Sequence, residues 1–373
     1  MDKIKILVVV GTRPEIIRLS EIMKQLDKDY KLVVVNSMQN FDENLNKVFF
    51  EDLGLRDSDY VLEMSRMNTM GAISKILIEV DRILEIENPD AFLVLGDTNS
   101  CLSVLSAKKR RIPVFHLEAG NRCFDETVPE EINRRVVDHI ADVNFTYSLI
   151  AREYLIREGK DPYFIVKIGS PMKEVINSQK SKIEKSEILG KLGLTKDNYF
   201  VMSIHRDENV TDRNILNNLK EIVDYICDEI QIKLILTLHP KTKENLNKHG
   251  IKLNSSVIVC LPLKYTDYMK LQINSKLVIS DSGSINEESS ILKFQAINFR
   301  KNHERPESND EANTILSGVE TSHVIQAINM TLNQMTQNIK IQPVSEYEIE
   351  NVSVKVSRNI MSYIQKIGKI IPN

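Results

Sequence analysis

The chain has 373 residues, which is long enough for two domains of ordinary size, and its 42% hydrophobic and 27% charged residues are typical of a globular protein. A formal net charge of -3 argues against a nucleic-acid partner, and the four cysteines lie far apart, without the spacing of a zinc site or a disulfide framework. No segment has the length of a signal peptide or a membrane span, so we expect a cytoplasmic protein without a membrane partner.

The first half of the chain alternates apolar strands with helices. The run at 4–10 is rich in valine and isoleucine, as in a buried parallel strand, and a glycine turn with Arg13 then opens a helix that continues to about residue 26. Such a turn points N–H groups outward and can bind an anion, although many first βα turns share this pattern. Further strands are predicted at 32–35, 91–95, 114–116, 143–146 and 164–167, and further helices at 41–52, 70–87 and 99–109.

A polar stretch at 116–135 follows a strand and enters a helix opened by proline. On that helix Glu130 and Arg134 are four residues apart and share one face. Because open α/β sheets keep their chemistry at the carboxyl ends of strands, we expect a functional site here. The alternative is a solvated loop with a surface ion pair between Glu131 and Arg135.

A Gly-Ser-Pro break at 169–171 precedes a second series, so we predict a hinge there. The first domain is placed at 1–171 and the second at 172–359, and a terminal helix at about 360–373 is expected to pack back on the first. Alternating strands and helices predict parallel sheets covered on both faces, that is, two Rossmann-like α/β domains with one active site in the cleft between them. The second series has strands at 199–204, 232–238, 257–261, 277–279 and 295–298, with helices at about 181–191 and 214–228 and a helical tail from 345.

The two halves offer different chemistry. The first supplies the carboxylates Asp97, Glu118 and Glu130, each at a strand end or on the helix that follows. The second supplies His205 and Arg206, two adjacent cations whose mutual repulsion favours a nearby anion. Each group has a purely structural alternative: Asp97 could cap the next helix, and the His239-Pro240 pair could only end a strand.

A glycine turn adds a second anion site. The helix that follows Ser282, Gly283 and Ser284 can direct its first N–H groups at a phosphate, and Glu288 lies one turn further, within reach of a ribose diol. The sequence therefore predicts a nucleoside diphosphate held by the second domain and a sugar presented to the carboxylates of the first.

Eight motifs occur in the order found in the non-hydrolysing UDP-N-acetylglucosamine 2-epimerases, which the chain resembles from residue 4 to about 320. The resemblance implies a GT-B-like arrangement of the two domains with UDP in the cleft, a homodimer, and neither a metal nor a nicotinamide cofactor. The motifs are GTRPE at 11–15, GDT at 96–98, HLEAGNR at 116–122, PEEINR at 129–134, HRDEN at 205–209, HP at 239–240, DSGSINEE at 281–288 and ERPE at 304–307.

The same resemblance implies roles for individual residues. Those that match the family's catalytic groups are Asp97, Glu118 and Glu130, with Arg134 and His205 as supporting groups. Those that match its UDP-binding groups are Arg13, Arg206, Tyr268, Ser282, Gly283, Ser284 and Glu288.

Segments such as NRCFDETVPEEINRRVVDH are most similar to one branch of the family. That branch converts UDP-2-acetamido-2,6-dideoxy-L-talose to UDP-N-acetyl-L-fucosamine for capsule or O-antigen synthesis, and the alternative substrate pair is UDP-N-acetylglucosamine and UDP-N-acetylmannosamine. Asn121 stands where the family usually has leucine, and Arg18 where it has lysine. Gln39-Asn40 replaces the Gln-His pair of the family's allosteric site, which puts activation by a second UDP-sugar in question.

The C2 hydrogen of the sugar lies beside an acetamido nitrogen and is too weakly acidic for direct removal by a carboxylate. The expected route therefore eliminates UDP to leave a 2-acetamido glycal, and then re-adds UDP while C2 is protonated on the opposite face. This route needs acid–base groups on both faces of C2 and cations at the diphosphate. A GT-B glycosyltransferase, a hydrolysing epimerase and a non-catalytic UDP-sugar sensor are the competing hypotheses.

Overall fold

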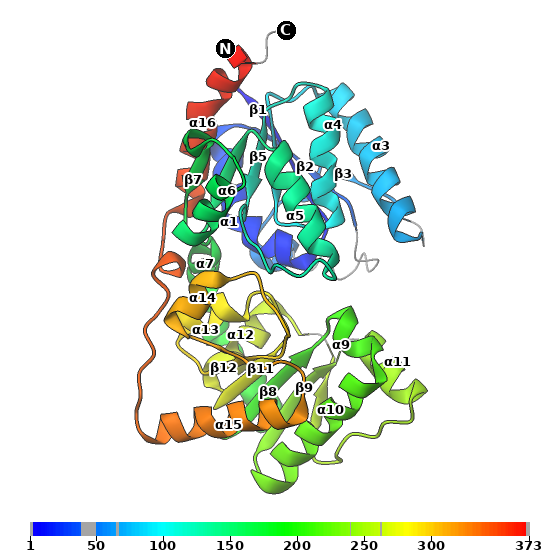
Figure 1. Ribbon diagram of the computed structural model, residues 1–373, viewed down its shortest axis with the longest axis vertical. Helices are drawn as coiled ribbons and strands as arrows, with labels where there is room; N and C mark the ends of the chain where they lie inside the picture. Colours follow the sequence, from blue (N-terminus) through cyan, green and yellow to red (C-terminus); the bar gives the residue numbers. More distant parts are fainter. Residues whose placement is uncertain (1–2, 39–49, 65–66, 239, 262, 371–373) are drawn as a thin grey trace. The chain divides into compact units, whose positions relative to one another are not determined.

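The computed structural model describes residues 3–38, 50–64, 67–238, 240–261 and 263–370. The chain forms two compact units, the first made of Met1–Ser178 with Ser345–Asn373 and the second of Gln179–Val344. Each unit is a parallel sheet between helices (Figure 1). Within the described residues, no helix is long and apolar enough to cross a lipid bilayer.

The first unit contains a seven-stranded sheet in the order β3-β2-β1-β4-β5-β6-β7, with every pairing parallel. The chain builds one side of β1 first and then crosses to β4 on its other side, which makes β1 and β4 the switch point of a doubly wound sheet. The strands are β1 Lys5–Val10, β2 Lys31–Asn36, β3 Tyr60–Val61, β4 Ala91–Leu95, β5 Val114–Leu117, β6 Val143–Thr146 and β7 Ile165–Lys167.

Helices cover this sheet because its central strands are apolar on both faces. Residues 6–10 of β1 are at most 1% exposed, so both faces need a covering layer. The helices of this unit include α1 Arg13–Asp29, α3 Thr69–Glu87, α4 Val104–Lys109, α5 Pro129–Ile140, α6 Leu149–Arg157 and α16 Val352–Ile370. The helix α7 Met172–Lys185 begins in this unit and ends in the second. A 3-10 turn, Asn99–Ser103, precedes α4, and most of the predicted helix at 41–52 lies outside the described residues.

The boundaries between the units differ from those predicted. They fall at 178/179 and 344/345 instead of 171/172 and 359/360, and all of α16 belongs to the first unit. This helix is fastened to the end of α1, where the Tyr30 hydroxyl donates to the Ser357 carbonyl (2.7 Å) and the Ser357 hydroxyl donates to Asp29 (2.5 Å). The expected hinge is also anchored, because the Ser170 N–H donates to the Glu346 carbonyl (3.0 Å) of the returning chain.

The second unit repeats the design with a six-stranded parallel sheet in the order β10-β9-β8-β11-β12-β13. Its strands are β8 Tyr199–Ile204, β9 Lys233–Leu238, β10 Ile258–Cys260, β11 Leu277–Ser280, β12 Ala296–Asn298 and β13 Ile315–Leu316. Its helices are α8 Ile188–Lys191, α9 Asp207–Thr211, α10 Arg213–Asp224, α11 Pro240–Lys248, α12 Tyr265–Asn274, α13 Ile285–Leu292, α14 Pro306–Glu311 and α15 Thr321–Thr336. The prediction of two Rossmann-like α/β domains is confirmed, whereas the strands β3 and β13 and the helices α6, α9, α11, α14 and α15 were not predicted from the sequence.

Candidate active site

Three predicted residues of the first unit lie at one edge of its sheet. Arg13 opens α1 after β1, Asp97 follows β4, and Glu118 directly follows β5. These strands are neighbours, with Val8 opposite Leu93 and Leu95 opposite Leu117. The fold therefore brings their carboxyl ends together at the switch point, where open α/β sheets bind ligands.

Asp97 is oriented by the helix α5. Arg134 donates to its Oδ2 from both Nε (3.0 Å) and Nη2 (2.7 Å), and Asn133 donates to its main-chain carbonyl (2.9 Å). The Asp97 side chain is 20% exposed and that of Arg134 only 4%, so the cation is enclosed and the carboxylate remains reachable. Two charge-assisted hydrogen bonds from one guanidinium to a single carboxylate oxygen hold the carboxylate in place.

Glu118 is buried and has an unusual backbone. Its φ of +65° lies in the left-handed region, which non-glycine residues seldom adopt and which often marks a functional site. The Tyr147 hydroxyl donates to its Oε2 (3.2 Å), and Arg18 Nε lies 3.5 Å from the same oxygen. Arg18, which replaces the family's usual lysine, thus places a buried positive charge beside this carboxylate.

Glu130 lies in the first turn of α5, one turn before Arg134, and is partly exposed. The alternative prediction for this region, a surface pair of Glu131 with Arg135, accounts for only part of the contacts that Glu131 makes. Arg135 does donate to Glu131 (3.1 Å), but Glu131 is fully buried and also accepts from Arg134 (2.8 Å) and from the Cys123 N–H (3.0 Å). The helix therefore joins the loop before it to the Asp97 site.

Glu15 is a residue whose contribution the sequence analysis missed. Its Oε2 accepts the N–H groups of Gly11 (2.8 Å) and Thr12 (2.7 Å), and its Oε1 accepts the hydroxyl of Thr98 (2.6 Å), the residue after Asp97. Burial raises the pKa of Glu15, against the effect of these donors. The carboxylate links the first glycine turn to the Asp97 loop. Glu15 is the last residue of the GTRPE motif, and that position was the sequence signal that could have identified it.

In the second unit, the buried Asp281 holds together the loops after β8 and β11. It accepts hydrogen bonds from the N–H groups of His205 (3.1 Å) and Arg206 (2.9 Å) and from the side-chain amide of Asn209 (3.0 Å). Its Oδ1 also lies 3.0 Å from His205 Nδ1. The anion expected beside His205 and Arg206 is thus present in the chain itself, so their adjacency does not by itself require a phosphate. Asp281, the first residue of its motif, was not among the predicted site residues.

The ionisation of Asp281 makes its stabilising effect depend on pH. Burial acts to raise its pKa, but the charge and hydrogen bond of His205, with Asn209 and the Arg206 N–H, outweigh burial and lower the pKa. A lowered pKa in the folded state means that the carboxylate stabilises the protein above the unfolded value of about 3.9, and that this contribution is lost as pH falls through the folded pKa.

We therefore expect Asp281→Asn to lower the free energy of unfolding by about 2 kcal/mol or more at pH 7, the value for charged buried hydrogen bonds. Urea denaturation at several pH values measures this difference, which should shrink below about pH 4. Asp310→Asn, an exposed position on α14, is the control and should leave stability unchanged. An equal loss for Asp281→Asn at pH 3 and pH 7 would show that the charge is not the cause.

The glycine turn after β11 leads into a short chain of hydrogen bonds. The Ser282 and Ser284 hydroxyls lie 3.0 Å apart, Ser284 donates to Glu288 Oε1 (2.7 Å), and Gln272 donates to Glu288 Oε2 (3.0 Å). Glu288 is thereby fixed at the base of the turn and is 4% exposed. A side-chain carbon on Gly283 would lie 3.2 Å from the Glu304 carboxylate, so glycine permits this close approach.

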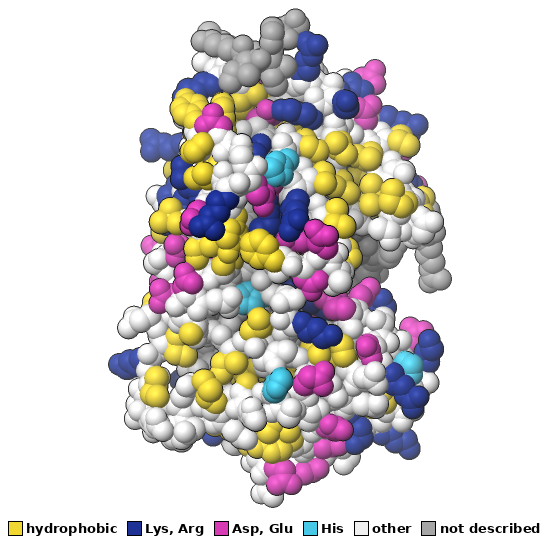
Figure 2. All heavy atoms as spheres, viewed as in Figure 1, with side chains coloured by type: hydrophobic (Ala, Val, Ile, Leu, Met, Phe, Trp, Pro, Cys, Tyr) yellow, Lys and Arg dark blue, Asp and Glu magenta, His cyan; other side chains and the backbone are white. Residues whose placement is uncertain are grey.

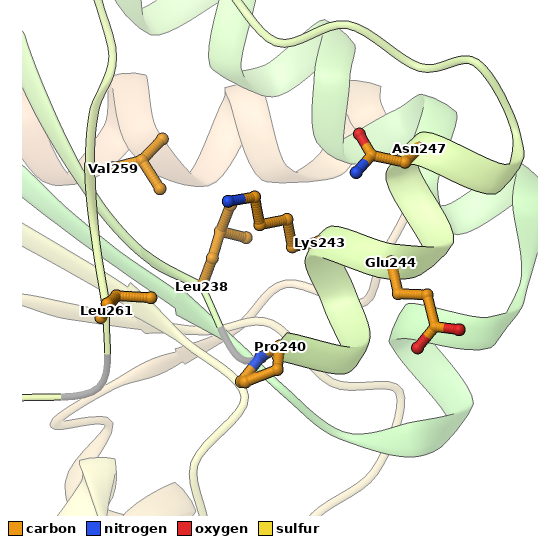
Figure 3. A pocket seen from close by; sticks show the side chains of 7 residues that line it. All are labelled: Leu238, Pro240, Lys243, Glu244, Asn247, Val259 and Leu261. Atoms are coloured by element: carbon orange, nitrogen blue, oxygen red, sulfur yellow. The ribbon is translucent and has the colours of Figure 1, made fainter.

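Tyr268, the predicted uracil-stacking residue, lies on α12 and packs partly buried against the core of the second unit. A separate cavity of about 710 Å³ lies between α11 and the edge strand β10. Figure 3 shows Val259 and Leu261 on one side of it and Lys243 extending into it from α11. None of the predicted UDP-binding residues lines this cavity, and His239 lies outside the described residues.

Comparison with known proteins supports the family resemblance that the motifs indicate. The sequence model of the UDP-N-acetylglucosamine 2-epimerase family matches residues 24–361. The chain belongs to this family. The structure of the UDP-N-acetylglucosamine 2-epimerase from Rickettsia bellii is 43% identical to this epimerase, with a TM-score of 0.92 and 99% of both chains covered.

Two further relatives widen the comparison. The UDP-GlcNAc 2-epimerase of Methanocaldococcus jannaschii, solved in complex with UDP-GlcNAc and UDP, is 32% identical with a TM-score of 0.89, covering 96% of this chain and 100% of its own. The UDP-2,3-diacetamido-2,3-dideoxy-D-glucuronate 2-epimerase of Pseudomonas aeruginosa is 30% identical over 90% of this chain and 94% of its own. The prediction of an isomerase is confirmed, and the chain is a 2-epimerase-type enzyme.

Within the described ranges, no three His, Cys, Asp or Glu side chains are grouped as metal ligands would be. The structure brings Asp97 and Arg134 into direct contact in the first unit. In the second it gathers His205 and Arg206 about Asp281, and the serine turn about Glu288. Each of these groups of contacts lies within one unit.

Proposed function

We propose that this epimerase inverts C2 of a UDP-2-acetamido sugar by elimination and re-addition of UDP. The observation that carries the proposal is the enclosed Arg134 that holds Asp97 at the switch point of the first sheet, with Glu118 at the end of the adjacent strand β5. General acid–base chemistry at carbon needs fixed carboxylates, and this edge supplies them. The proposed catalytic residues are Asp97, Glu118 and Glu130, supported by Arg134 and His205.

The second unit would hold the leaving diphosphate. The N–H groups that open α13 after Ser282 and Gly283 form an anion-binding turn of the kind that stabilises phosphate, and Arg206 adds a cation. Glu288, held by Gln272, would bind the ribose hydroxyls, and Tyr268 would contact the uracil. Arg13, on the edge of the first sheet, would supply a further cation.

With UDP so held, the first step breaks the bond between C1 and the UDP oxygen while one carboxylate removes the C2 proton. The electron pair of the C–H bond forms the C1–C2 double bond of a 2-acetamido glycal, and UDP accepts the electrons of the C–O bond. In the return step UDP attacks C1 and a second carboxylate protonates C2 on the other face. Two acid–base groups are needed because one cannot reach both faces of a fixed sugar.

We propose UDP-2-acetamido-2,6-dideoxy-L-talose as substrate and UDP-N-acetyl-L-fucosamine as product, for capsule or O-antigen synthesis. The support is the similarity of the segment at 121–139 to that branch of the family. The named relatives act on different sugars, UDP-N-acetylglucosamine and a diacetamido glucuronate, so the family fold serves more than one sugar. UDP-N-acetylglucosamine is accordingly the second candidate substrate.

One experiment tests both the reaction and the substrate. The protein is incubated in D2O with each UDP-sugar separately, and proton NMR follows the C2 signal. We expect the L-talose compound to be converted and deuterium to enter C2 of its product. Retention of hydrogen at C2 would contradict proton exchange, faster conversion of UDP-N-acetylglucosamine would reassign the substrate, and accumulation of free sugar would indicate a hydrolase.

We also propose a cytoplasmic homodimer. Figure 2 shows hydrophobic side chains gathered over α3 and α4 of the first unit, and Ile78, Ile86 and Leu105 are exposed there (54%, 71% and 37%). Apolar side chains grouped in this way often mark a protein interface. Sedimentation equilibrium should give twice the chain mass, and Ile78→Glu should shift the mass toward that of one chain; a monomeric wild type would refute the dimer.

A further inference from the structure

His116 begins the polar stretch singled out in the sequence, yet it cannot touch a substrate because its side chain is completely buried. Its two ring nitrogens make specific contacts instead. Nε2 lies 2.8 Å from the carbonyl oxygen of Gly96, and Nδ1 lies 2.9 Å from Oδ1 of Asp138. A carbonyl can only accept, so Nε2 carries the hydrogen of the first bond. Gly96 is the residue immediately before Asp97, which makes this contact a link between β5 and the Asp97 loop.

Asp138, on α5, is the other end of this link and is also fully buried. Its carboxylate accepts the N–H of Gly120 at 3.2 Å on both oxygens and the Nη1 of Arg122 at 2.6 Å. Gly120 lies two residues after Glu118, in the same left-handed turn. One carboxylate therefore holds the turn that carries Glu118 and, through His116, the peptide that carries Asp97.

A further ion pair extends this network of His116, Asp138 and Arg122 toward the surface. Arg122 forms a bidentate pair with Glu158, through Nε at 2.8 Å and Nη2 at 2.5 Å, and Glu158 also meets His139 at 3.1 Å. Buried charges that are fully hydrogen-bonded restrict their neighbours to one arrangement. A shift of about 1 Å in a reacting group can cost about 10²-fold in rate, so a device that fixes two such groups at once has a catalytic consequence.

We propose that the His116–Asp138 pair is a positioning device that sets Asp97 and Glu118 relative to each other through the main chain beside them. The inference rests on the proposed function, which assigns acid–base roles to those two carboxylates. His116 and Asp138 are positioning residues, because each acts through the Gly96 or Gly120 peptide and neither contacts the sugar.

The test uses two replacements that separate the two ring contacts. Asparagine places its amide near the position of Nδ1 and loses the bond to Gly96, whereas the longer glutamine can keep an N–H near the position of Nε2. We expect His116→Asn to lower kcat by about 10- to 100-fold, with His116→Gln recovering part of the loss. The Kd for UDP should stay within about twofold of wild type, because the proposed UDP groups of the second unit are untouched. His323→Asn, at an exposed position of α15 in the second unit, is the control and should turn over normally.

Equal kcat for wild type and folded His116→Asn would overturn the proposal, as would equal losses for the asparagine and glutamine variants. Absence of turnover in the wild type would refute the proposed function instead. In that case, crystal structures of wild type and His116→Asn decide the positioning claim, since an unmoved Gly96–Asp97 peptide would refute it. A variant that fails to fold is replaced by Asp138→Asn, which is expected to lower kcat with the same unchanged Kd for UDP.

Discussion

Asp97→Asn is expected to lower kcat by about 10²- to 10⁴-fold, the usual contribution of a positioned general acid or base. Asparagine has the shape of the native side chain and can still accept hydrogen bonds from Arg134 through its oxygen, but it cannot exchange a proton at C2. The loss should therefore appear in kcat, with the Kd for UDP unchanged, and deuterium incorporation at C2 should fall in proportion. NMR-monitored turnover with the substrate that the wild type converts measures both quantities.

The matched control is Asp81→Asn. Asp81 is a partly exposed residue of α3 that pairs with Arg110 (2.6 Å), so the same change of charge is made at the surface of the same unit. Surface pairs of this kind contribute about 0 to 1 kcal/mol, and we expect normal kcat and near-normal stability. If Asp97→Asn retained full activity, the acid–base role would be wrong and the hypothesis of a non-catalytic UDP-sugar sensor would gain support.

The largest effect on stability is expected from Gly120→Ala. Gly120 has φ of +79°, and a side-chain carbon there would lie 2.3 Å from the carbonyl oxygen of Ala151 and 3.1 Å from Leu155 Cγ. Both contacts belong to α6, whose first turn cannot yield without breaking its own packing. The left-handed backbone and the overpacking together should cost about 3 to 5 kcal/mol. That is a large share of the total stability of about 5 to 15 kcal/mol for a domain.

Gly159→Ala separates the cost of the left-handed backbone from the cost of overpacking. Gly159 has φ of +87°, but a side-chain carbon there would meet no heavy atom of the described residues within 4 Å, so only the backbone cost remains, about 1 to 2 kcal/mol. Urea denaturation followed by far-UV circular dichroism suits a chain without tryptophan. Equal losses for the two variants would mean that the contact with α6 does not matter.

The consequence of Gly120 extends beyond stability. Its N–H is held by Asp138, and its close approach to Ala151 leaves no room for the turn that contains Glu118 to relax. The same peptide thus links the packing of α6 to the geometry of a proposed acid–base group. This coupling explains why a strained residue such as Glu118, with φ of +65°, can persist in the folded state.

Much of the fold was determined by local sequence. Continuous apolar runs such as 6–10 and 91–95 are typical of central parallel strands, and Pro129 opened its helix as predicted. The edge strands β3 and β13 are two residues long and carry too little pattern to detect. The packing of α16 on the first unit rests on contacts between residues more than 300 positions apart in the chain, which no local pattern contains.

The candidate site divides in the same way. By itself the sequence determined which residues stand at strand ends, since strand, turn and helix signals are local, and its ordered motifs determined the family. Only the tertiary structure decided what those residues do to one another: that Arg134 holds Asp97, that Asp281 supplies the anion beside His205, and that His116 is buried. Such contacts join segments distant in sequence, and the strength of a charge pair depends on burial and distance, which no local pattern contains.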